Sequence, residues 1–89
     1  MSLSALFAAR VSGRGLSQLE IEKLASRSGY SSNGWPEFGE GGRRSRSVAT
    51  FRGDRGEFFY ATPDERKRLV VTAVRMTLLR WRVMEIEES

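Results

Sequence analysis

The stretch of residues 63–86 limits the fold more than any other part of the chain, because it contains no glycine and no proline after Pro63. Thr62, Pro63 and Glu65 supply an N-cap, a proline at the first helical position and a capping-box glutamate. The pattern predicts one C-terminal helix over 63–86, about 36 Å long at 1.5 Å per residue. Its apolar side chains fill a broad arc, and such a helix needs cover on most sides. We therefore expect a protein partner or a homodimer at this helix.

Arg80 falls within the apolar arc of that helix, between Met76 and Met84. A buried guanidinium without a partner is strongly destabilising. We expect Arg80 to pair with Glu20 or Glu22. The alternatives are that it reaches solvent near the helix end or lies at a partner interface.

Residues 47–62 predict a β-hairpin with a two-residue loop at 54–55. In that register Arg52 faces Glu57 as a cross-strand ion pair. Two strands alone are only marginally stable in water, so we expect the hairpin to pack on the long helix.

Two short helices are predicted before the hairpin, over residues 4–11 and 18–27. Ser17 and Glu20 form a capping box at the start of the second helix, because each side chain can bond the other residue's backbone amide. Gly29 stands where a glycine commonly ends a helix. The capping box and Gly29 therefore predict where the second helix begins and ends.

Together these elements predict an α+β fold of order α-α-β-β-α in a single small domain over residues 1–89. Residues 28–46 lack periodicity and form a Gly/Ser/Arg-rich loop. Tyr30, Trp35 and Phe38 give that loop three aromatic side chains that could anchor it to the core or to a partner.

Positive charge is concentrated in two segments of the chain. The net charge is +4, and residues 41–55 sum to +4 and residues 66–82 to +6, while the remainder sums to −6. Such an asymmetry favours an anionic partner, although ordinary solvated arginine-rich faces give the same pattern. The predicted nucleic-acid contacts are Arg43, Arg44, Arg46, Arg52, Arg55, Arg68, Arg75 and Arg82.

The absence of cysteine and histidine argues against several classes of protein. It removes the usual general base, nucleophile and zinc ligands, so we expect no enzyme, no metal, no cofactor and no small-molecule substrate. No apolar run reaches the ~20 residues of a membrane span, and we expect a cytoplasmic protein with no membrane partner. Residues 1–15 also resemble an organellar targeting segment, but we favour a first helix there.

A helix-turn-helix is a further alternative, because Ala25 and Gly29 match the first half of that pattern. Gly34 and Pro36 fall where the recognition helix would run, and both disfavour a helix. An ordinary glycine C-cap explains the same residues more simply.

The leading hypothesis is a small basic protein that binds DNA or RNA through its arginine-rich loop and hairpin. The alternative is a protein-interaction module, such as a small adaptor or a virus-encoded inhibitor that docks on a larger complex. Its predicted partner-binding residues are Tyr30, Trp35, Phe38 and Arg80.

Overall fold

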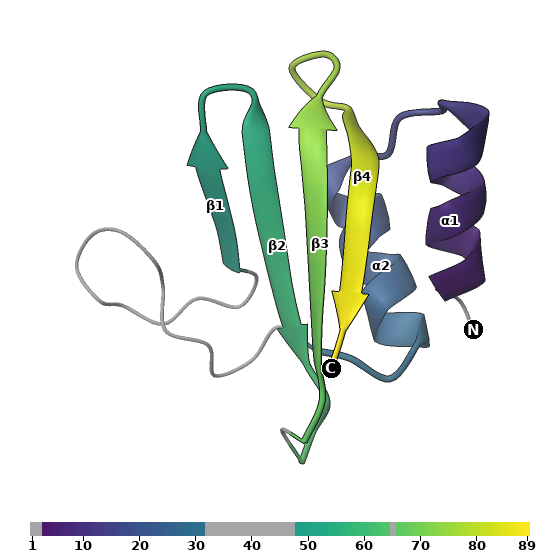
Figure 1. The fold of residues 1–89 in the computed structure, drawn as a ribbon, viewed down its shortest axis with the longest axis vertical. Helices are drawn as coiled ribbons and strands as arrows, with labels where there is room; N and C mark the ends of the chain where they lie inside the picture. Colours follow the sequence, from purple (N-terminus) through teal and green to yellow (C-terminus); the bar gives the residue numbers. More distant parts are fainter. Residues whose placement is uncertain (1–2, 32–47, 65) are drawn as a thin grey trace.

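The computed structural model describes residues 3–31, 48–64 and 66–89. Two helices lie against one face of a four-stranded antiparallel sheet (Figure 1). The elements are α1 (Leu3–Ser12), α2 (Gln18–Arg27), β1 (Val48–Arg52), β2 (Arg55–Ala61), β3 (Arg68–Arg75) and β4 (Trp81–Glu88). The strands lie in the order β1-β2-β3-β4, so each strand pairs with its neighbour in the chain.

The predictions for the two helices are confirmed. Helix α2 spans the predicted residues, and its capping box is formed: the Ser17 amide donates to Glu20 Oε1 at 2.9 Å and the Glu20 amide donates to Ser17 Oγ at 3.1 Å. Gly29 follows the helix with φ 90°, and Gly13 follows α1 with φ 77°. Both glycines therefore end their helices in a conformation that other residues rarely adopt.

The prediction of a C-terminal helix is wrong, and the predicted α-α-β-β-α order is therefore wrong as well. Residues 68–88 instead form the antiparallel strands β3 and β4. Leu69, Val71 and Ala73 are fully buried at a spacing of two, which is the period of a strand. Four of the eight residues of β3 are β-branched, and these favour strands over helices. The expectation of a homodimer rested on the absent helix and loses that basis.

The residues read as a helix cap form the turn between β2 and β3. Thr62 Oγ1 donates to Asp64 Oδ1 at 2.7 Å, and the Thr62 amide donates to the Lys67 carbonyl at 3.1 Å. Hydrogen bonds from the Thr62 hydroxyl and from Arg66 hold the pKa of the Asp64 carboxyl at about 2. The same polar side chains can serve a helix start or a turn, so the sequence motif did not distinguish them.

The predicted hairpin forms, but its predicted register is wrong by two residues. The two-residue turn lies at Gly53 and Asp54, so that Arg52 faces Arg55 and Thr50 faces Glu57. Gly53 adopts φ 63°, which the first position of tight hairpin turns requires. A shift of two residues leaves each side chain on the same face of the sheet.

The core lies between the helices and one face of the sheet. Its fully buried side chains include Leu6 and Ile21 from the helices and Phe58, Val71 and Val83 from the strands. Neither of the two described helices lies over the other face of the sheet, which we call the open face (Figure 1).

The segment between the helices closes the edge of β4. The Leu16 amide donates to the Trp81 carbonyl at 2.8 Å, and the Trp81 amide donates to the Leu16 carbonyl at 2.7 Å. This bridge pairs backbone groups that an edge strand would otherwise expose. It also brings the linker between α1 and α2 next to the loop between β3 and β4.

Candidate functional site

Three exposed arginines form one row across the open face of the sheet. Arg52 lies opposite Arg55, Arg55 lies opposite Val74, and Val74 lies opposite Arg82. Residues directly opposite each other in an antiparallel sheet share a face, so all four side chains project to the same side. We call Arg52, Arg55 and Arg82 the arginine row. No ion pair joins them to a carboxylate within the part of the chain that the structure describes.

The dimensions of the arginine row follow from the spacing of the strands. Neighbouring strands lie about 4.8 Å apart, so the row spans about 14 Å from β1 to β4. The next row on the same face carries Glu57 and Glu85, with Thr50 at its β1 end. A hollow of about 340 Å³ lies between the two rows at β1 and β2, lined by Thr50, Arg52, Arg55 and Glu57. The three arginines of the row therefore lie together at the end of the face near the β1–β2 turn, and the next row is acidic.

Two of the other predicted arginines lie elsewhere. Arg68 lies opposite Ala61, six residues along β3 from the row and about 20 Å away at 3.4 Å per residue. Arg75 lies over aromatic rings, 4.8 Å from the Trp81 ring centre and 5.9 Å from that of Phe51. Arg75 is therefore held in an aromatic cluster and does not project from the row.

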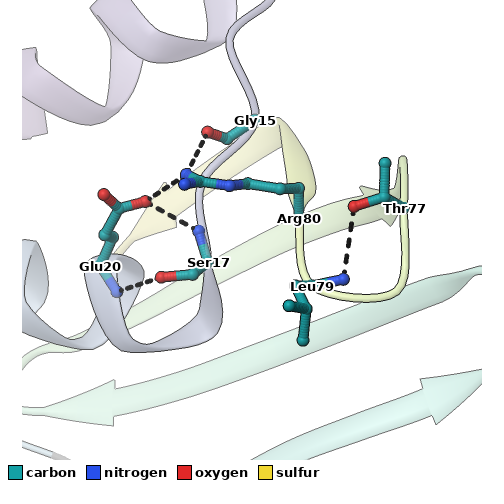
Figure 2. Close-up of polar contacts among 6 residues, drawn as sticks. All are labelled: Gly15, Ser17, Glu20, Thr77, Leu79 and Arg80. Carbon is teal, nitrogen blue, oxygen red and sulfur yellow. Dashed lines mark hydrogen bonds and ion pairs between the residues drawn. The ribbon is translucent and has the colours of Figure 1, made fainter.

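The loop between β3 and β4 is fixed to the helices through Arg80 (Figure 2). Arg80 Nη1 donates to Glu20 Oε1 at 2.8 Å and to the Gly15 carbonyl at 3.2 Å. The prediction that Arg80 pairs with Glu20 is confirmed, although the residue is half-exposed on a loop and not buried on a helix. The Ser17 amide, and to a lesser degree Arg80 and Arg14, lower the pKa of Glu20 below its ordinary value.

The same loop exposes three apolar side chains, which we call the apolar tip: Met76, Leu78 and Leu79. Leu78 is 82% exposed and Leu79 is 77% exposed. The sequence predicted a helix over this stretch and gave no indication of the apolar tip, because residues 76–80 contain no glycine or proline to mark a turn.

The two predicted partner-binding residues that the structure describes lie in different parts of the fold. Tyr30 is 4% exposed and belongs to the core, while Arg80 lies in the β3–β4 loop. The remaining predicted site residues lie outside the described residues: Trp35, Phe38, Arg43, Arg44 and Arg46.

Neither a metal site nor a membrane-spanning helix is found in the described residues. These residues contain no cluster of acidic side chains suited to a metal ion, and neither α1 nor α2 is long and apolar enough to cross a membrane. Comparison with protein-family models, curated proteins and solved structures finds no match to this chain. Function must therefore be argued from the site itself.

Proposed function

We propose that the chain is a small, non-enzymatic, cytoplasmic nucleic-acid-binding module that contacts phosphates with Arg52, Arg55 and Arg82. The observation that supports the proposal is the arginine row on the sheet face that neither α1 nor α2 covers. A guanidinium is always charged and can bond phosphate oxygens through two parallel N–H groups. These arginines are exposed and have no acidic partner among the described residues, so they can bind phosphate without breaking an ion pair.

The length of the arginine row is compatible with contacts to several phosphates of one nucleic acid. A length of about 14 Å matches the rise of roughly four base pairs, at 3.4 Å each, along the axis of a duplex. Glu57 and Glu85 would repel phosphate from the next row, so the backbone would follow the arginines across the strands. Arg43, Arg44 and Arg46 are proposed as additional contacts from the segment that precedes β1.

The experiment is a salt titration of binding to a labelled DNA duplex, a single strand and an RNA hairpin. Each phosphate contact contributes about 0.9 to the slope of log K against log salt for a duplex and about 0.7 for a single strand. The triple variant R52A/R55A/R82A is expected to bind more weakly. Its slope of log K against log salt is expected to be shallower by the contribution of about two to three phosphate contacts.

A matched variant controls for net charge. R10A/K23A/R27A removes three positive charges from exposed positions of the two helices, away from the open face. It is expected to retain most of the slope. If both triple variants lower the slope equally, the arginine row is not the contact site.

The salt titration also decides between the nucleic-acid proposal and a protein partner. If the protein binds none of the three nucleic acids at about 50 mM salt, where electrostatic binding is strong, the proposal fails. The alternative of a protein-interaction module then takes its place.

A further inference from the structure

The apolar tip is exposed although its backbone is well held. The Met76 and Thr77 amides donate to the Arg80 carbonyl at 2.8 and 3.2 Å, and the Leu79 amide donates to Thr77 Oγ1 at 3.3 Å. Arg80 in turn is bonded to Gly15 and Glu20 (Figure 2). The loop therefore presents two neighbouring leucines to solvent in a defined shape, and grouped exposed apolar side chains commonly mark an interaction site.

Three connections meet at the same end of the molecule as the apolar tip. The β1–β2 turn, the β3–β4 loop and the linker between α1 and α2 all lie at the top of Figure 1, and we call this the loop end. Further exposed apolar residues follow or precede these connections in the chain: Val11, Leu19, Phe51 and Val74.

Charge at the loop end is mainly positive. Besides the arginine row, Arg14 is exposed in the linker. The acidic side chains of this end are Asp54, which is exposed in the β1–β2 turn, and Glu20, which is paired with Arg80. An apolar protrusion at the same end of the molecule as these arginines is complementary to a surface that is anionic outside and apolar beneath.

We propose that the loop end docks on an anionic lipid bilayer, with Leu78 and Leu79 entering the interface and the surrounding arginines bonding lipid phosphates. A bilayer accepts a convex tip because its lipids rearrange around it, and it attracts basic residues when its headgroups are anionic. A nucleic acid offers no comparable apolar layer for exposed leucines. This activity goes beyond nucleic-acid binding, because it requires Leu78 and Leu79 in addition to the arginines.

The test measures sedimentation of the intact protein with vesicles of phosphatidylcholine alone and of phosphatidylcholine mixed with phosphatidylserine. We expect binding to the mixed vesicles and much weaker binding to the neutral ones. The variant L78S/L79S is expected to lower partitioning at least tenfold, equivalent to about 1.4 kcal/mol. Phe7→Ser changes an exposed apolar residue in the middle of α1 and is expected to leave binding unchanged.

A second measurement reports insertion directly. Because the chain has no cysteine, a Leu79→Cys variant carries a polarity-sensitive dye at the tip alone. Its emission is expected to shift to the blue with mixed vesicles, whereas a dye on Phe7→Cys is expected not to shift.

Three results would overturn the proposal: no vesicle binding, binding that survives L78S/L79S, or a tip dye that does not shift. Self-association that L78S/L79S abolishes, without vesicle binding, would assign the tip to a second copy of the chain. Nucleic-acid binding by L78S/L79S is expected to equal that of the unchanged protein. A failure here is therefore distinguishable from a failure of the proposed function.

Discussion

At the scale of single residues, Gly56 shows how closely the strands and the aromatic cluster fit together. A Cβ at this position would lie 3.1 Å from Trp81 Cζ3 and 3.3 Å from Phe51 Cδ1. Trp81 is buried, pairs with Leu16 through its backbone and packs edge-on to Phe58, so it has little room to retreat. The limited space, and not the backbone conformation, therefore favours glycine at this position.

Gly56→Ala is therefore expected to destabilise the protein by about 1–3 kcal/mol, the usual cost of overpacking a filled core. Urea unfolding measures this change, and the tryptophan emission reports the displacement of the ring. Unchanged stability together with unchanged emission would show that the Trp81 and Phe51 rings accommodate the added methyl group at no cost.

Glu20 is expected to contribute to the pH dependence of stability. Its pKa is lowered from 4.5 in the folded protein, first by the Ser17 amide and then by Arg80. The ionised form is thus favoured by folding, so its contribution is present above pH 4.5 and is lost as the pH falls through the lower folded value. The side chain is 41% exposed, which keeps the contribution below about 1 kcal/mol.

Urea unfolding from neutral to acidic pH tests this expectation. Glu20→Gln should be less stable than the unchanged protein at neutral pH and should lose less stability on acidification. Glu22→Gln removes the same charge from the same helix and is the control. Equal acid sensitivity of the unchanged protein and Glu20→Gln would exclude a contribution from the ionised carboxylate.

At the scale of elements, short sequence motifs predicted the helix whose ends are stabilised by neighbouring residues. The Ser17–Glu20 capping box and Gly29 fixed the limits of α2, because their hydrogen bonds and dihedral angle involve only nearby residues. Residues 68–88 could not be assigned in this way. Their apolar residues satisfy both the strand and the helix periodicity, and the side-chain contact that ties the turn at 76–80 to α2 joins Arg80 to the distant Glu20.

Strand β3 is expected to be the most protected element in amide exchange. It pairs on both sides, with β2 and with β4, and Leu69 and Val71 are fully buried. Strand β1 pairs only with β2 in the described part of the sheet and should exchange faster. Equal protection in β1 and β3 would show that the sheet opens only as a whole.

At the scale of the whole molecule, the candidate site depends on pairing across the sheet. The sequence identified Arg52, Arg55 and Arg82 as basic, but not as neighbours, because Arg82 joins the other two only through β3 and the register of three strand pairs. The apolar tip had no signal of its own. Composition thus favours an anionic partner, which stays a prediction, while the grouping of Arg52, Arg55 and Arg82 in one row required the tertiary structure.

The contact between the helices and β4 has a consequence for synthesis of the chain. Helix α1 packs on β4, and Leu16 pairs with Trp81, the first residue of that strand. The ribosome produces α1 and α2 first among the six elements and β4 last. Since short helices are marginal in water without tertiary packing, the nascent helices must wait for β4 with their apolar faces unburied. A translational pause before β4 would prolong that exposure and favour capture by a chaperone.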